Sequence, residues 1–408
     1  MTDQGTPDTV SKALTEGVHH HHAPLRHGDE AVAQGELRRL TAADVVDEAI
    51  SILRQSCYAQ PMTAKGKFWP GGGIGALAAA VAWAWPAEAL SAEAPAPLNL
   101  DMPIRCTPGE TCWIVKYVDL DPTPGRLDYR CGRLADDGHK GTDFAIRDLA
   151  VMRTGVDVLA AAAGTVVGTR DGMRDVNVGR IGGPEALKGK DCGNGVRIRH
   201  ADDWSIQYCH MRKGSVAVKT GDKVTAGQHL GLVGLSGKTD FPHVHITVTH
   251  GKKVVDPFVG TGPREDCALG EKPLWKLDVL KQLVYRSVSL YNAGFAAAKP
   301  KVNAVRNGRH QEKVLSREAP ALVLWVDTFW PRPGDELSFH ITAPDGKTVL
   351  RYRQVLKHKA ARGFYFAGVR NKAKSWPAGV YRGEVRLVRE NGLDGREEYS
   401  TTREVTLR

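Results

Sequence analysis

Three familiar sequence signatures are missing from this 408-residue chain. It has no H-E-x-x-H segment, which excludes a site that pairs two metal-binding histidines with a glutamate base on one helix. It has no C-x-x-C pair, which argues against a zinc site made of thiolates. No basic run is interleaved with aromatic residues, and we therefore expect no nucleic-acid partner. Any metal site in this chain must therefore be built from histidines and carboxylates in a different arrangement.

The overall composition is that of an ordinary globular protein, with 42% hydrophobic and 25% charged residues. The length predicts about two or three domains. The formal net charge is +10, and it is unevenly distributed. Residues 1–92 hold 7 Lys and Arg against 10 Asp and Glu, so the remainder of the chain carries +13. This excess favours an anionic partner through long-range attraction.

The stretch 241–249 (FPHVHITVT) contains the pattern around which the chain is organised. Apolar and polar residues alternate in it, which predicts a half-buried strand. His243 and His245 are two positions apart, so both should face the same side, roughly 6.6 Å from each other along the strand. One imidazole could hold a metal while the other reaches toward whatever that metal binds.

A second stretch, 138–146 (GHKGTDFAI), supplies further metal donors. We expect Gly141 to bend the chain through a positive φ, so that His139 and Asp143 converge. With one of the two strand histidines they would give three protein ligands and leave a fourth position open, as in catalytic zinc sites. His210, in SIQYCHM, is the candidate for proton transfer.

At this point the chain resembles the lysostaphin-type (LytM-like) zinc endopeptidases, which cut peptide cross-links in bacterial cell walls. The resemblance covers residues 139–257 and rests on ordered motifs: HKGTD, VLAAAAGTVVG, GNGVRIRH, YCHM, VKTGDKVTAGQHLGLVG, PHVH and VDPF. It implies that Zn²⁺ is bound by His139, Asp143 and His245. It also implies that the attacking water and the scissile carbonyl are flanked by two further histidines, His210 and His243.

Two departures from the usual family text lie close to these residues. Asp240 and Phe241 precede PHVH where relatives commonly place small residues, and they could narrow the groove or shift specificity. YCHM stands where YAHL is more frequent, and Cys209 is then most simply half of a disulfide.

The function that the resemblance implies is zinc-dependent hydrolysis of amide bonds in the peptide stems of peptidoglycan. An alternative is a LytM-like domain that binds the wall or activates an amidase without hydrolysis. A peptidase that acts on proteins is a third possibility. The stretch VKTGDKVTAGQHLGLVG also resembles hairpins of biotinyl and lipoyl carrier domains, but it presents no exposed lysine at a hairpin tip.

Six other histidines are not expected to bind the catalytic metal: His200, His229, His250, His310, His340 and His358.

Residues 62–92 have the layout of a secretory signal peptide. Two lysines are followed by an apolar run over 74–85 and then by A-x-A sites. The run is shorter than the ~20 residues of a membrane span, so we expect no stable span after signal removal. We expect Met62 to be the true start and residues 1–61 to be a non-native extension; the alternative is a cytoplasmic extension on a signal-anchored protein. The signal predicts export to the periplasm or beyond the cell.

Cysteine usage agrees with export. Cys57 precedes the predicted signal, which leaves an even number that should form disulfides: Cys106, Cys112, Cys131, Cys192, Cys209 and Cys267. Cys192 and Cys209 flank a predicted hairpin and are a natural pair. The other four are expected to tie the segment before His139 to the domain.

The chain as a whole is predicted to be mainly β. Residues 93–134 would be a linker and the first part of the catalytic domain, and 135–265 its antiparallel sheet or barrel. Leucines and aromatics at helical spacing predict a helical connector over 266–314. Short strands with frequent turns predict an immunoglobulin-like β-sandwich over 315–408.

Overall fold

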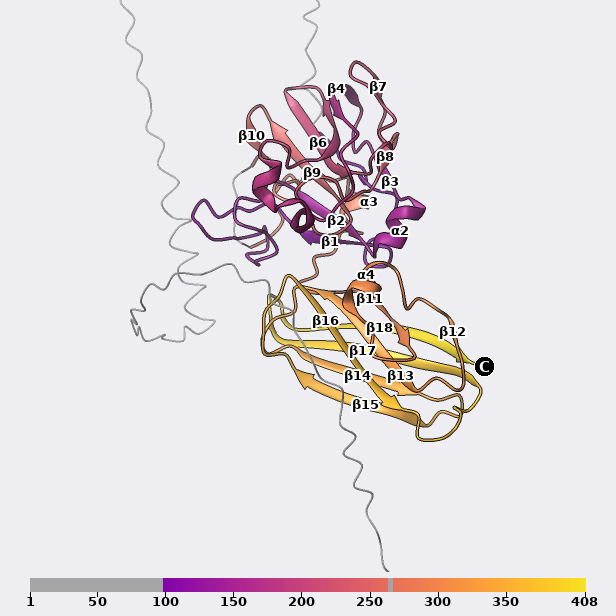
Figure 1. The fold of residues 1–408 in the computed structure, drawn as a ribbon. Coiled ribbons are helices and arrows are strands. Elements are labelled where there is room, and N and C mark those ends of the chain that lie inside the picture. The colour runs from indigo at the N-terminus through magenta and orange to yellow at the C-terminus, as the bar shows by residue number, and fades with distance from the viewer. Residues whose placement is uncertain (1–97, 263–266) are drawn as a thin grey trace, which may run out of the picture. The chain divides into compact units, whose positions relative to one another are not determined.

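The computed structural model describes residues 98–262 and 267–408 (Figure 1). In these residues the structure is mainly β with antiparallel sheets, which confirms the predicted fold class. Among them, none of the helices has the length and apolar character that crossing a membrane requires. The predictions of a non-native extension over 1–61 and of a signal peptide over 62–92 concern residues outside the described part.

The first part of the described chain is built of short strands with three brief helical segments after β1. In chain order these elements are β1 (Cys112–Lys116), β2 (Thr142–Ile146), α2 (Leu149–Thr154), β3 (Asp157–Leu159), β4 (Gly164–Arg170), η1 (Val178–Ile181), η2 (Pro184–Leu187), β5 (Asn194–Arg199), β6 (Trp204–Met211), β7 (Lys223–Val224), β8 (His229–Leu232), β9 (His243–His250) and β10 (Lys253–Val254). Here η marks a 3₁₀ helix.

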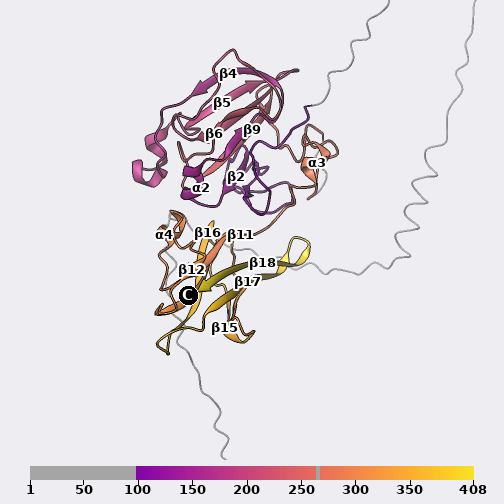
Figure 2. The same ribbon diagram turned by 90° about the vertical axis from the view of Figure 1, so that its right-hand side faces the viewer.

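One eight-stranded sheet dominates this part. Its order is β1-β2-β9-β6-β5-β4-β7, with β10 paired to β9, and all of its strand pairs are antiparallel. Figure 2 shows β4, β5, β6 and β9 side by side in this order. Strands β3 and β8 form a separate two-stranded sheet.

Strand β9 has a central place in the sheet because β2 and β6 pair with its two edges. Its apolar residues Val244, Ile246 and Val248 are almost fully buried in the hydrophobic core. The alternation read from the sequence therefore describes this strand correctly, and it leaves both strand histidines on the opposite face.

The second part contains two further short helices and eight strands. Their bounds are α3 (Leu277–Leu280), β11 (Ser289–Ala296), α4 (Val302–Arg306), β12 (Val314–Leu315), β13 (Ala321–Phe329), β14 (Glu336–Thr342), β15 (Thr348–Val355), β16 (Arg362–Arg370), β17 (Gly379–Gly392) and β18 (Gly395–Leu407).

These strands make two sheets that share one core. The first sheet has the order β11-β13-β16 and the second β12-β18-β17-β14-β15. Phe295 and Leu324 from the first sheet lie in the same buried cluster as Phe339 and Val385 from the second. The arrangement is a β-sandwich; its immunoglobulin-like character stays a prediction.

The predicted helical connector over 266–314 is wrong in its centre. Helices α3 and α4 lie within this range, but residues 289–296 form β11, an edge strand of the smaller sandwich sheet. Every residue of β11 is buried, so the strand carries no alternation of apolar and polar residues. Burial on both faces thus removes the period of two by which a strand is recognised in a sequence.

Three disulfides join the six cysteines of the described residues. Cys192 is bonded to Cys209 as predicted, and Cys131 is bonded to Cys267, 136 positions away. The third bond closes a short loop between Cys106 and Cys112. It lies wholly within the segment before His139, so the expectation that all four of the remaining cysteines tie this segment to the domain is wrong for that pair.

Candidate metal centre

The pairing of β2 with β9 brings two of the predicted metal ligands together. Asp143 on β2 stands directly opposite His245 on β9 in the antiparallel register. His139 lies three residues before β2 begins, and its backbone carbonyl accepts a hydrogen bond from the Asp119 amide at 2.8 Å. Residues about one hundred positions apart in the sequence therefore converge because two strands are hydrogen-bonded neighbours.

The three side chains form a tight cluster. His139 Nε2 lies 3.2 Å from Asp143 Oδ1, and His245 Nδ1 lies 2.8 Å from the same oxygen. One potential ligand atom from each residue lies within 4.8 Å of the others. Two imidazole nitrogens and a carboxylate oxygen are donors that zinc accepts, so the residues present fit a metal ion.

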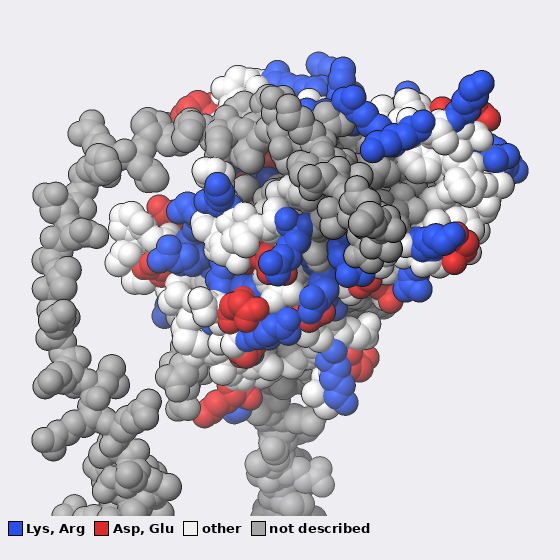
Figure 3. Space-filling view, turned by 90° about the horizontal axis from the view of Figure 1, so that it is seen from below, with Lys and Arg blue, Asp and Glu red and all other residues white. Residues whose placement is uncertain are grey.

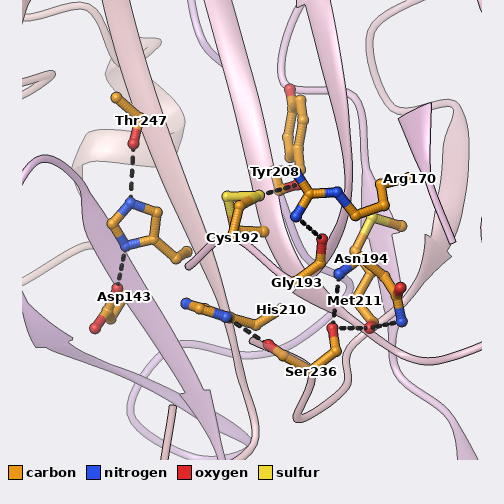
Figure 4. Close-up of a disulfide and its surroundings, with 12 residues drawn as sticks. Asp143, Arg170, Cys192, Gly193, Asn194, Tyr208, His210, Met211, Ser236 and Thr247 are labelled. Carbon is orange, nitrogen blue, oxygen red and sulfur yellow. Dashed lines mark hydrogen bonds and ion pairs between the residues drawn. A yellow bond between two sulfur atoms is a disulfide. The ribbon is translucent and has the colours of Figure 1, made fainter. Parts of the chain in front are cut away.

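The outward nitrogens of the two imidazoles are held in place by other groups. His139 Nδ1 donates to the Tyr117 carbonyl at 2.7 Å. His245 Nε2 lies 2.9 Å from the hydroxyl of Thr247, a residue labelled in Figure 4. Because the outward nitrogens are engaged in this way, His139 Nε2 and His245 Nδ1 are the nitrogens that face Asp143. Partners of this kind fix the ring orientation of metal-binding histidines.

Gly141 has a different role from the one that the sequence predicts. The positive φ in this turn is at Gly138 (71°), and Gly141 is not among the residues with positive φ. A Cβ atom at position 141 would lie 2.2 Å from the Ile246 carbonyl oxygen and 2.6 Å from His245 Nε2. Glycine is needed here because strand β9 and the His245 ring pass so close to the backbone.

The two histidines predicted to handle protons lie beside the cluster. The ring centroids of His210 and His243 are 4.6 Å apart, and His243 Nε2 lies 3.5 Å from Asp143 Oδ2. His210 Nδ1 donates to the Ser236 carbonyl at 2.7 Å, and His243 Nδ1 lies 3.0 Å from the Phe241 carbonyl oxygen. The structure thus gathers all five predicted site residues in one place.

Burial and neighbouring charges set the protonation states. Burial raises the pKa of the Asp143 carboxyl, but interactions with His139 and His243 outweigh it and hold this pKa well below its usual range. Burial also lowers the pKa of His245. The pKa of His210 is lowered well below its usual range, first by burial and then by the neighbouring His243 and His245. Burial lowers the pKa of His139 too, yet the charge and hydrogen bond of Asp143 raise it overall. Near neutral pH the carboxylate is ionised and His210 is a neutral imidazole.

The family model described as Peptidase family M23 matches residues 137–257, which span all five of these residues. This part of the chain is an M23 peptidase domain. The predicted resemblance to the LytM-like endopeptidases, which belong to this family, is therefore confirmed for that segment.

Two of the curated relatives of the M23 domain come from Vibrio cholerae. The peptidoglycan DD-endopeptidase ShyA is 30% identical over 161 residues, which cover 38% of this chain and 31% of ShyA. The peptidoglycan DD-endopeptidase ShyC is 30% identical over 130 residues, which cover 32% of this chain and 24% of ShyC. The matched region thus spans less than a third of either relative.

Among solved structures, a variant of the catalytic domain of the prophage-encoded M23 protein EnpA from Enterococcus faecalis is similar. It is 28% identical, the match covers 36% of this chain and 92% of that domain, and the TM-score is 0.26.

Sequence reasoning missed the groups that orient the M23 histidines. The carbonyls of Tyr117, Ser236 and Phe241 are backbone atoms, which leave no signature in the sequence. Thr247 could have been found, because it lies two positions after His245 on the same face of β9. Phe241 is buried and stacks on His243 with ring centroids 4.5 Å apart, so its side chain supports that ring rather than narrowing an open groove.

The Gly141→Ala variant should lose both stability and metal affinity. The added methyl group forces β2 away from β9 or displaces His245, and overpacking of this kind costs about 1–3 kcal/mol in the free energy of unfolding. Denaturant unfolding and zinc titration calorimetry would measure the two effects. Gly168→Ala is the matched control, because a Cβ there meets no atom within 4 Å. Equal behaviour of the two variants would contradict the assigned role of Gly141.

The metal-free protein should lose stability as the pH falls below about 6.5, partly through His210. The folded state keeps this imidazole neutral, whereas the unfolded chain binds a proton near pH 6.5, so acid favours unfolding. One such proton contributes about 1.4 kcal/mol per pH unit to the slope. His210→Gln should therefore flatten the dependence of the unfolding free energy on pH between about pH 6 and 5, measured by urea denaturation with a chelator present. Parallel curves for the two proteins would refute the burial of a neutral His210.

Proposed function

We propose that the M23 domain hydrolyses peptide cross-links of bacterial peptidoglycan with a zinc ion held by His139, Asp143 and His245. The observation that carries this proposal is the convergence of these three donors beside His210 and His243. Three protein ligands of nitrogen and oxygen type are the usual set of a catalytic zinc site, which keeps a further position for water or substrate. When bound, zinc supplies Lewis acidity that polarises a carbonyl and acidifies water.

His210 is assigned the role of the base. Its Nδ1–H is committed to the Ser236 carbonyl, which leaves the lone pair on Nε2. Because its pKa is lowered by burial and by the neighbouring histidines, this nitrogen is unprotonated near neutral pH. It can therefore take a proton from an attacking water.

His243 is assigned to the scissile carbonyl and the leaving amine. Its Nδ1 is held near the Phe241 carbonyl and the Thr239 hydroxyl, 3.0 and 3.2 Å away. The ring of Phe241 packs against it. The imidazole is thus oriented with Nε2 toward the cluster. There it can receive the proton taken from the attacking water, hydrogen-bond the developing oxyanion with it and deliver it to the leaving amine.

The names of ShyA and ShyC support peptidoglycan as the substrate class. The charge of the chain supports an anionic envelope polymer as well. Residues 288–408 hold 22 Lys and Arg against 12 Asp and Glu, and more blue than red side chains cover the face drawn in Figure 3. Three disulfides in the described residues support an oxidising compartment and hence an exported protein.

Digestion of defined muropeptide dimers, followed by mass spectrometry, tests the proposal. The purified protein should release monomers, a chelator should abolish the reaction, and added zinc should restore it. Casein serves as the protein control and should stay intact. Binding of the wall material without release of any product would instead favour the non-hydrolytic alternative.

Replacing His210 by alanine should separate metal binding from turnover. The zinc donors lie on β2, β9 and the loop before β2, so the variant should keep zinc while its turnover falls by at least about 100-fold. Asp143→Ala is the matched comparison and should lose zinc and activity together. Zinc content by atomic emission and initial rates on muropeptide dimers would measure both. Undiminished turnover in the His210→Ala variant would contradict the assignment of His210 as the base.

A further inference from the structure

His210 lies in an unusual backbone conformation. Its φ is +62°, in the left-handed region that L side chains rarely adopt. The register between β5 and β6 shifts at this point: Val196 pairs with Tyr208 and Asn194 pairs with Met211. Cys209 and His210 therefore stand opposite the single residue Gly195, which is the pattern of a β-bulge. A bulge turns a side chain away from the direction that the strand would give it.

A covalent bond closes this bulge. Cys209, the first bulged residue, is bonded to Cys192, and the Cys192 carbonyl accepts a hydrogen bond from the His210 amide at 2.8 Å. Gly195 makes room for the link, because a Cβ there would lie 2.3 Å from the Tyr208 carbonyl oxygen and 3.0 Å from Cys192 Sγ. The segment before β5 is thus fixed to the bulge by one disulfide and one hydrogen bond.

The same segment also fixes the group that holds the His210 ring. The backbone N–H of Asn194 donates to the Ser236 hydroxyl at 2.9 Å, and this hydroxyl donates to the Met211 backbone carbonyl at 2.7 Å. The Ser236 carbonyl in turn accepts from His210 Nδ1. In Figure 4 the His210 ring points toward Asp143, and the Ser236 carbonyl accepts the hydrogen bond from its Nδ1.

We propose that the Cys192–Cys209 disulfide is a positioning element that holds the His210 imidazole in its productive orientation. The proposal rests on the proposed function for the role of His210, and it deepens that function by naming what aims the base. Neither cysteine touches the reacting atoms in this account. Both act through the bulge, the His210 amide and the segment that carries Asn194.

A double substitution, Cys192→Ala with Cys209→Ala, tests the proposal in the full chain. The matched control removes the Cys106–Cys112 disulfide by the same two changes at its own cysteines. Both variants lose one cross-link, but only the first touches the bulge. Folding and zinc content are verified by circular dichroism and atomic emission, at a temperature below the melting transition of every variant.

The protein with Cys192→Ala and Cys209→Ala, called the bulge variant, should keep zinc and keep KM within about threefold. Its kcat should fall by about 10- to 100-fold, which is the effect of a misplaced catalytic group. The control variant should keep kcat. In the His210→Ala background the same cysteine changes should lower the residual kcat by less than about twofold, because the disulfide acts only through His210. A bulge variant with full kcat, or an equal loss in both backgrounds, would overturn the proposal.

A second measurement reads the position of the ring without any substrate. The imidazole proton resonances of His210, assigned by their loss in His210→Ala, should shift or broaden in the bulge variant and stay unchanged in the control. Unchanged resonances in both variants would overturn the proposal. Absence of any activity in the unmodified protein would count against the proposed function alone, since the resonances still decide whether the disulfide holds the ring.

Discussion

The antiparallel pairing of β2 with β9 is the constraint on which the site depends. It places Asp143 directly across from His245, on a sheet whose other face is anchored in the core by Val244, Ile246 and Val248. A shift of one residue would turn the histidines of β9 toward that core and the valines toward the carboxylate. The hydrophobic face of β9 therefore fixes the geometry of the polar face. Gly141 allows this close approach, because no side chain stands between the turn and β9.

A buried carboxylate needs partners, and the site provides them as imidazoles. Asp143 is only 2% exposed, so the desolvation of its charge must be offset locally. Its oxygens lie within 3.5 Å of nitrogens from three histidines, His139, His243 and His245. His210 stands farther from the carboxylate and is buried as the neutral form. The proposed set of metal donors uses His139 and His245 with this carboxylate, which leaves His210 and His243 for proton transfer.

The sequence predicted which five side chains lie close together better than it predicted some of the fold around them. The five residues belong to short motifs in which residue type and spacing both carry chemical meaning, and strand alternation predicted that His243 and His245 share one face of β9. The Cys192–Cys209 disulfide could also be predicted, because the two cysteines flank a hairpin whose strands are close in sequence. The Cys131–Cys267 bond spans 136 positions, and no local pattern could have indicated it.

The predictions that were wrong or missing also have physical reasons. Strand β11 was read as helix because burial on both sides removes the alternation that distinguishes a strand. The neighbours of Gly141 in the sequence indicate only its local conformation, and they predict a bend. Its importance comes instead from contact with β9, a strand more than one hundred residues later. The carbonyls that hold His139, His210 and His243 could not be predicted at all, since every residue carries the same acceptor.

The two halves of the site owe their precision to different kinds of structure. The proposed metal donors Asp143 and His245 lie on neighbouring strands inside a sheet, where ladder hydrogen bonds and a packed core already restrict their movement. His210 sits on a bulge, and the groups that orient it come from connections between strands, namely Cys192 before β5 and Ser236 before β9. Connections of this kind are ordinarily the more mobile parts of a domain. A covalent link across the bulge therefore restricts a part of the site that depends on such connections, next to His210, the proposed proton-transfer residue.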